Sequence, residues 1–244
     1  MVQRVIAVLS TLTVLGGQAS AGQCPSLDGA APVVGEQAAP ERVAYIRDSM
    51  DGAVPRAWMW AGGWSAGFAT ASVAQAALIP LSRTSEERRM LYVSVGGTVS
   101  GLGLVVISPP AVIRNRNKLA RAMEESSTDP CEVLRRAETL MVATSKAERL
   151  NQAWIMHGGN LAFNVGSGLI LGLGWEQWDA AFLTVSVGTL VGEIMIWTQP
   201  NAMTKALQRY QTGAWVAPPR HAMTLRLHPV FFEHTGGIGA SGTF

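Results

Sequence analysis

The amino-acid sequence predicts an all-α membrane protein. We expect four transmembrane helices as two tandem repeated hairpins, with an extramembrane helical segment and a Gly-rich C-terminal tail. Of the 244 residues, 48% are hydrophobic and only 15% are charged, whereas about a quarter are charged in a typical soluble domain. Lipid penalises charge, and the 8 tryptophans suit a membrane interface. The formal net charge of +2 is too small to indicate nucleic-acid binding.

Four apolar stretches with almost no charge are the second observation behind this prediction. They are residues 57–81, 90–113, 154–174 and 178–199. Each has roughly the 20 residues that a helix needs to cross a bilayer. Tryptophans stand near their ends, as in an aromatic belt: Trp58, Trp60, Trp154, Trp175, Trp178 and Trp197. The first and third stretches are rich in Ala, Gly and Asn, so we expect their insertion to depend on the neighbouring helix.

A repeat is the third observation. Residues 57–63 (AWMWAGG) resemble residues 153–159 (AWIMHGG), and the sequence VSVG occurs at 93–96 and again at 185–188. A basic helical stretch follows each hairpin, at 117–123 and at 205–210. Because each unit contains two membrane segments, the second copy keeps the orientation of the first. The repeat therefore predicts pseudo-symmetric packing of the two hairpins.

The apolar stretches divide the chain into six segments. These are a signal peptide (1–21), an extended tether and short helix (22–56), the first transmembrane hairpin (57–113), a charged helical linker (114–153), the second transmembrane hairpin (154–199) and the C-terminal tail (200–244). We expect Pro55 to interrupt the short helix. In the linker, Asp129-Pro130-Cys131-Glu132 is typical of a helix start. The alternating stretch at 224–228 and the glycine-rich end favour one or two short strands.

The first residues have the pattern of a secretory signal peptide. Arg4 supplies the positive charge, residues 5–15 an apolar run, and Ala19-Ser20-Ala21 a cleavage site of small residues. We therefore expect an exported protein of a bacterial cell membrane or envelope. An uncleaved membrane anchor is the alternative, although the run is short for a span of about 20 residues.

Two cysteines, Cys24 and Cys131, remain after removal of the signal peptide. In an oxidising compartment an even number of cysteines predicts a disulfide. Such a bond would stabilise the fold by roughly 4–5 kcal/mol in the chain-entropy model, because it closes a long loop. Two unpaired thiols are the alternative.

Two sequence rules give opposite orientations. An exported N-terminus places the tether, the linker and the tail outside, together with both cysteines. The positive-inside rule predicts the reverse, because Arg114, Arg116 and Lys118 lie directly beside a span. We follow the signal peptide, because three of its features agree.

Each apolar stretch contains one G-x-x-x-G pair, which places two glycines on one helix face and lets another backbone approach closely. The pairs are Gly63/Gly67, Gly97/Gly101, Gly168/Gly172 and Gly188/Gly192. We interpret them as helix-packing residues. The alternative is simple glycine abundance in a chain with 26 glycines.

One group of polar residues lies within the second hairpin. His157, Asn160 and Asn164 are in the third stretch, and Glu193 is inside the fourth. Counted outward from the turn between the stretches, His157 and Glu193 reach a similar depth. We therefore predict an intramembrane polar cluster of His157, Asn160 and Glu193. It is either a satisfied helix–helix hydrogen bond or a proton- or ion-handling pair.

The sequence predicts no catalytic, cofactor or metal site. Gly63-Trp64-Ser65-Ala66-Gly67 matches the G-x-S-x-G nucleophile pattern but lies in an apolar helix rather than after a strand. Residues 237–242 match G-x-G-x-x-G without a helix to follow, and the tail histidines lack metal-site spacing.

We therefore predict a non-enzymatic structural or assembly component of the envelope. Its partners would be the lipid bilayer and a second copy or another membrane protein, with no nucleic acid. A small transporter or channel subunit that uses His157 and Glu193 is the alternative.

Overall fold

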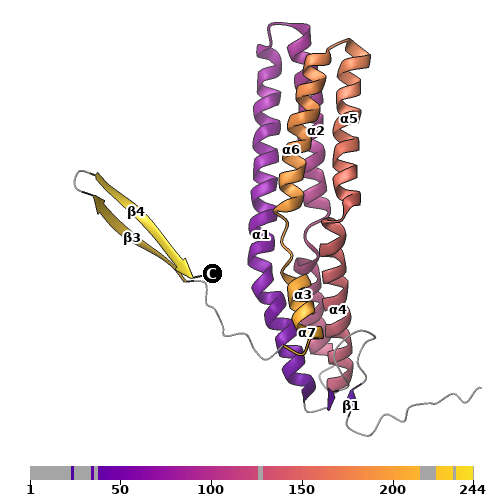
Figure 1. Cartoon of the computed structure of the whole chain (residues 1–244), viewed down its shortest axis with the longest axis vertical. Helices are drawn as coiled ribbons and strands as arrows, with labels where there is room; N and C mark the ends of the chain where they lie inside the picture. Colours follow the sequence, from indigo (N-terminus) through magenta and orange to yellow (C-terminus); the bar gives the residue numbers. More distant parts are fainter. Residues whose placement is uncertain are drawn as a thin grey trace, which may run out of the picture.

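The computed structural model describes residues 23–24, 34–35, 38–125, 129–214, 224–232 and 235–243. The predicted signal peptide (1–21) and most of the tether lie outside the described residues. The described chain is predominantly helical and has two parts: a helical bundle at one end and two helical hairpins that continue from it (Figure 1).

The longest helix, α1 (Ala39–Leu78), belongs to both parts. A short 3-10 helix (Ile79–Leu81) ends it, and α2 (Ser85–Ile107) returns beside it to complete the first hairpin. The expected interruption at Pro55 is wrong, because Pro55 lies inside the continuous helix. Proline removes one backbone hydrogen bond, but Ala53 and Ala57 on either side are buried against the bundle. This packing holds the helix together through the proline.

The second apolar stretch ends earlier than expected. Helix α2 stops at Ile107, Ser108-Pro109-Pro110 turns the chain, and α3 (Ala111–Glu125) begins a new helix in the bundle. The predicted limit at residue 113 is therefore wrong. Val112 and Ile113 are apolar because they are buried in the bundle core. The rest of α3 is the basic helix that was predicted at 117–123.

The second half of the chain follows the predicted order. Helix α4 (Pro130–Asn151) starts at Asp129, whose Oδ1 accepts hydrogen bonds from the backbone N–H groups of Cys131 (2.9 Å) and Glu132 (3.3 Å). Helices α5 (Trp154–Trp175) and α6 (Trp178–Trp197) form the second hairpin around a turn at Glu176 (φ 60°). Helix α7 (Ala202–Gln211) then returns into the bundle.

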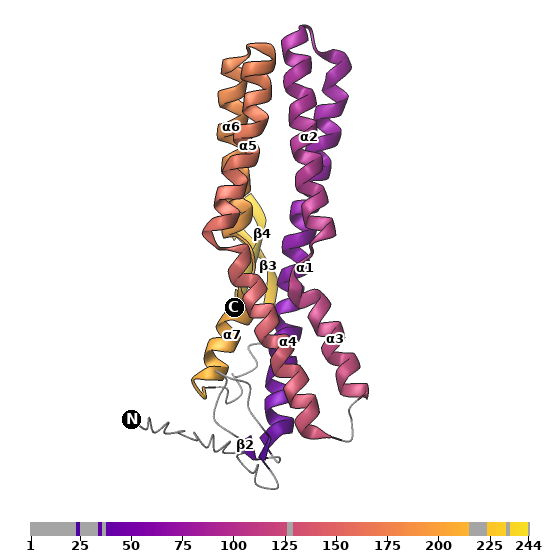
Figure 2. The ribbon, with the colours of Figure 1, turned by 90° about the vertical axis from the view of Figure 1, so that its right-hand side faces the viewer.

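Two small antiparallel sheets complete the described chain. Strand β1 (Gln23–Cys24) pairs with β2 (Val34–Gly35), which lies beside the start of α1 (Figure 2). In the tail, β3 (Thr224–Phe232) pairs with β4 (Thr235–Thr243), so that Thr224 faces Thr243 and Phe232 faces Thr235. The prediction of one or two strands in the tail is confirmed.

The bundle has a closed apolar core between α1, α3, α4 and α7. Its fully buried members include Ile46, Met50, Leu119, Leu134, Met141 and Met203. A disulfide joins Cys24 of β1 to Cys131 of α4 across a sequence separation of 107. The predicted disulfide is confirmed, and it holds the N-terminal strand onto the bundle.

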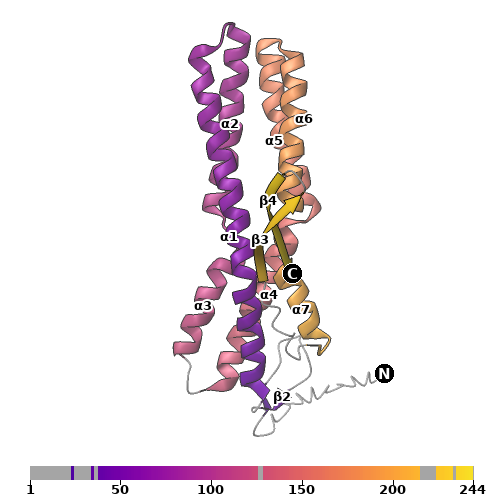
Figure 3. The ribbon, with the colours of Figure 1, turned by 90° about the vertical axis from the view of Figure 1, so that its left-hand side faces the viewer.

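The two hairpins have little enclosed core. They stand side by side, α1 with α2 and α5 with α6 (Figures 2 and 3). Their large apolar side chains are exposed along the whole length, for example Trp58, Val73, Tyr92, Leu104, Leu161, Phe182, Leu190 and Trp197. Among the described residues, the helical stretches Ser85–Glu125 and Trp178–Gln211 are long and apolar enough to cross a membrane. The expected spans in α1 and α5 do not meet that criterion.

Candidate functional site

The polar residues of the second hairpin meet between α5 and α6. The Nδ1 atom of His157 lies 2.5 Å from Oε2 of Glu193. The Asn160 side-chain amide donates to Oε1 of Glu193 (3.0 Å) and to the backbone carbonyl of Thr189 (2.9 Å). The imidazole of His157 also packs against the indole of Trp197, with 5.6 Å between ring centroids. The structure thus brings His157, Asn160 and Glu193 together.

The cluster lies near the end of the hairpin that adjoins the bundle. His157 is in the first turn of α5 and Glu193 is in the last two turns of α6. At 1.5 Å of rise per residue, His157 is roughly 5 Å beyond Trp154, and Glu193 is roughly 6 Å from Trp197. The two side chains are 28% and 29% exposed. Glu193 is therefore closer to the end of its helix than we expected from the apolar stretch, which continues to residue 199.

Asn164 extends the cluster toward the middle of the hairpin. Its amide nitrogen donates to the backbone carbonyl (2.8 Å) and the side-chain oxygen (2.9 Å) of Asn160. Gly188 and Gly192 of α6 face these two asparagines: a Cβ added at Gly188 would overlap Oδ1 of Asn164, and one at Gly192 would overlap Oδ1 of Asn160. The glycine pair of α6 therefore makes room for asparagine amides, a role that its spacing alone did not indicate.

The other predicted glycines divide into two groups. A Cβ at Gly168 would meet Val185, one at Gly172 would meet the Trp178 ring, and one at Gly101 would meet the Phe68 ring, in each case within 3.0 Å. These glycines allow close packing inside a hairpin. Added Cβ atoms at Gly63, Gly67 and Gly97 would have no neighbour within 4 Å. No described residue therefore packs closely against these three glycines.

Side-chain contacts join the two hairpins at both ends. Near the bundle, the indole N–H groups of Trp60 (3.2 Å) and Trp64 (3.3 Å) in α1 both donate to the Thr198 hydroxyl. At the opposite end, the guanidinium of Arg89 lies 5.6 Å from the centre of the Trp175 ring. An exposed cation–π contact contributes little energy. The described contacts at the two ends therefore align the hairpins but do not enclose a core between them.

A buried polar network in the bundle was not predicted. Arg42 and Glu138 form an ion pair (3.3 Å) in which both side chains are only 1% exposed. The Tyr210 hydroxyl donates to Glu138, and the Arg42 guanidinium lies 4.5 Å above the Tyr210 ring. Burial, and then the hydrogen bond to Glu138, raise the pKa of Tyr210 above its ordinary value. The network joins α1, α4 and α7, and its full enclosure indicates a packing role.

Glu148 is a second buried carboxylate that the sequence did not reveal. It accepts hydrogen bonds from the backbone N–H groups of Met203 (3.2 Å) and Thr204 (2.7 Å), and from the Thr204 hydroxyl (3.0 Å). It therefore caps the first turn of α7, whose preceding residue Asn201 makes no side-chain capping bond. Burial raises the pKa of Glu148, and these hydrogen bonds oppose that rise.

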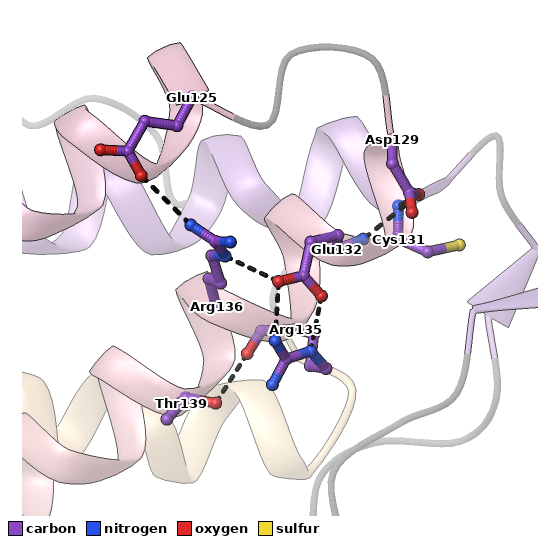
Figure 4. A network of polar contacts seen from close by, with 7 residues as sticks. All are labelled: Glu125, Asp129, Cys131, Glu132, Arg135, Arg136 and Thr139. Atoms are coloured by element: carbon purple, nitrogen blue, oxygen red, sulfur yellow. Dashed lines mark hydrogen bonds and ion pairs between the residues drawn. The ribbon is translucent and has the colours of Figure 1, made fainter.

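A surface network ties α3 to α4 near the disulfide (Figure 4). Glu132 pairs with Arg135 and Arg136, both at 2.7 Å, and Arg136 also reaches Glu125 of α3 (3.4 Å). The hydrogen bonds from the two arginines lower the pKa of Glu132 to about 2. Because Glu132 is solvent-accessible, the network fixes local geometry more than it adds stability.

No three His, Cys, Asp or Glu side chains among the described residues converge to hold a metal ion. Comparison with known proteins finds no family that matches this chain and no curated protein or solved structure that is significantly similar to it.

Proposed function

We propose that this chain is an exported integral membrane protein of the cell envelope with a structural or assembly role. In this proposal four helices cross the bilayer as two hairpins. The observation that carries the proposal is the contrast between the two parts of the molecule. Large apolar side chains are buried in the bundle and exposed over the hairpins. Water would make the second arrangement costly, whereas lipid accommodates it.

The helix lengths support four spans. Helices α2, α5 and α6 have 23, 22 and 20 residues, or about 35, 33 and 30 Å at 1.5 Å per residue. The part of α1 beyond the bundle, residues 58–78, is about 31 Å long by the same rise. A bilayer hydrocarbon core is about 30 Å thick. The polar residues of α5 point into the hairpin toward α6, which supports insertion of α5 as a pair with that helix.

The disulfide supports placing the bundle on the oxidising side of the membrane. Disulfides persist in exported compartments and are rare in the cytosol. Because Cys24 and Cys131 are both in the bundle, the short turns of the two hairpins would then lie on the opposite side.

The open glycines of the first hairpin support a role in assembly. One exposed face of α1 consists of small residues: Gly63, Ala66, Gly67 and Thr70. Small residues at this spacing let another transmembrane helix approach closely, which strengthens van der Waals packing in lipid. We propose that a second copy or another membrane protein packs here.

Substitution of Gly67 tests this assembly role. A photo-reactive residue in place of Thr70 should cross-link the chain to its partner in membranes, and Gly67→Leu should abolish that product. Leu183→Phe, which also adds bulk at an exposed position but in the second hairpin, should leave it unchanged. Equal products from all three chains would contradict an interface on α1.

The contact between His157 and Glu193 favours a second candidate, a small transporter or channel subunit. An ionisable residue within a membrane helix is costly, so such residues pair with one another or face water, and they often mark the path of protons or ions. If the pair moves protons or ions, Glu193→Gln should change uptake or conductance without reducing assembly, while Glu176→Gln in the hairpin turn should not. Loss of assembly and flux in parallel for Glu193→Gln would assign the pair to packing.

A further inference from the structure

Five exposed cations surround the end of the bundle that adjoins the hairpins. They are Arg56 of α1, Arg114 of α3, Lys146 and Arg149 of α4, and Lys205 of α7. We call this set the basic rim. None of the five forms an ion pair with a described residue. A set of unpaired cations at one level is available for an external anion.

Contacts between the helices show that the rim residues share one level. Arg114 and Lys205 are each in the first turn of a helix that leaves a hairpin, and Arg149 is in the last turn of the helix that enters one. The Asn115 amide donates to the Thr144 hydroxyl (2.8 Å), which aligns the start of α3 with the part of α4 just before Lys146. Glu148 bonds to the start of α7, which aligns that helix as well. Arg56 is two residues before Trp58 on α1.

The carboxylates near this level are already engaged. Asp51 binds Arg116 (2.8 Å), and Glu148 is buried in its contacts with α7. The remaining acidic residues of the described bundle lie farther from the hairpins, in its middle or at its far end: Glu41, Asp48, Glu124, Glu125, Asp129, Glu132 and Glu138. The bundle is therefore positive beside the hairpins and contains most of its negative charge away from them.

The rim has a feature that helix stability does not explain. The N-terminal turn of a helix carries a partial positive charge and disfavours cations, yet Arg114 and Lys205 occupy the first turns of α3 and α7. Both copies of the repeat place them alike: Pro-Pro-Ala precedes Arg114 and Pro-Asn-Ala precedes Lys205, with two residues between the alanine and the cation. An external anion would remove this local cost in both halves.

We infer that the basic rim binds the phosphate groups of anionic phospholipids in the leaflet beside the bundle. The rim spans four helices, and α3 and α7 stand on opposite sides of the bundle (Figures 2 and 3), so a bilayer reaches all of it where a protein partner would cover one side. Exposed Trp58, Trp154 and Trp197 stand directly beyond the rim, where indole rings favour the headgroup region. Lysines and arginines at such a surface attract anionic lipid.

The inference rests on the proposed membrane placement, and quenching of tryptophan fluorescence tests both separately. The full chain is reconstituted into phosphatidylcholine vesicles that contain either brominated phosphatidylcholine or brominated phosphatidylglycerol. We expect stronger quenching by the brominated phosphatidylglycerol, and added salt should weaken this preference. In Arg114→Gln/Lys205→Gln the preference should fall by up to about fivefold for each cation removed.

The matched control removes the same charge from the same helices. Arg121 and Arg209 are exposed on α3 and α7, farther from the hairpins, and Arg121→Gln/Arg209→Gln should keep the preference. Circular dichroism of both double variants checks that the helices are retained. Equal quenching by both lipids in the unmodified chain, or equal losses in the two double variants, would overturn the inference. No quenching by either lipid would instead contradict the membrane placement.

Discussion

The fit between Gly188 and Asn164 allows a quantitative prediction for Gly188→Ala. The added methyl group would overlap Oδ1 of Asn164, which is buried and bonded through its nitrogen to Asn160. Overpacking of this kind costs about 1–3 kcal/mol, and the helix preference of alanine returns at most about 1 kcal/mol. We expect a net loss of up to about 2 kcal/mol from these two terms.

A double-mutant cycle separates the overlap from other effects. In the Asn164→Ala background the methyl group has space, so Gly188→Ala should be neutral there or stabilise the fold by up to about 1 kcal/mol. Gly166→Ala is the control, because an added Cβ on this α5 glycine would have no neighbour within 4 Å. Reversible unfolding in mixed micelles, followed by circular dichroism, gives the free energies. Equal stability of Gly188→Ala and Gly166→Ala would refute the proposed packing of α5 against α6.

Three further predictions concern the bundle. Replacing Cys24 and Cys131 with serine should lower the free energy of unfolding by about 4–5 kcal/mol, measured by thermal or denaturant unfolding; an unchanged value would show that the disulfide contributes nothing. Tyr210→Phe removes the hydroxyl that donates to buried Glu138 and should cost about 1–3 kcal/mol in the same assay. Because burial raises the pKa of Glu148 above its usual 4.5, the folded state binds that proton more tightly than the unfolded state. The unmodified chain should therefore gain stability relative to Glu148→Gln as the pH falls through this raised pKa, with the gain complete below 4.5; a difference that does not vary with pH would contradict the raised pKa.

Sequence alone predicted the helical order and the disulfide but placed some boundaries wrongly. Hydropathy measures how apolar a residue is, not whether it faces lipid or a protein core. Val112 and Ile113 therefore extended the second stretch, although they pack inside the bundle. We expected Pro55 to interrupt the helix because proline cannot donate a backbone hydrogen bond. The packing of the flanking alanines offsets this loss, and the helix continues.

The candidate functional site was predicted only in part. Counting residues from a tight turn predicted that His157 and Glu193 lie at the same level, because paired helices advance equally, and the two side chains are in contact. The contacts of Arg42, Glu138 and Tyr210 were missed because three helices far apart in sequence form them. A signal was present, since Arg42 stands beside Val43 on the stripe that later buries Ile46. A charged residue on an apolar stripe indicates a buried partner, although not which one.

We propose that the disulfide-linked bundle lies on the oxidising side of a membrane that the hairpins cross. Labelling with a membrane-impermeant maleimide tests it directly, on intact and on permeabilised cells, with any outer membrane first made permeable to the reagent. We predict that Cys24 and Cys131 react in intact cells, and only after reduction. Reaction that requires permeabilisation of the inner membrane but no reductant would place both thiols in the cytoplasm and contradict the orientation.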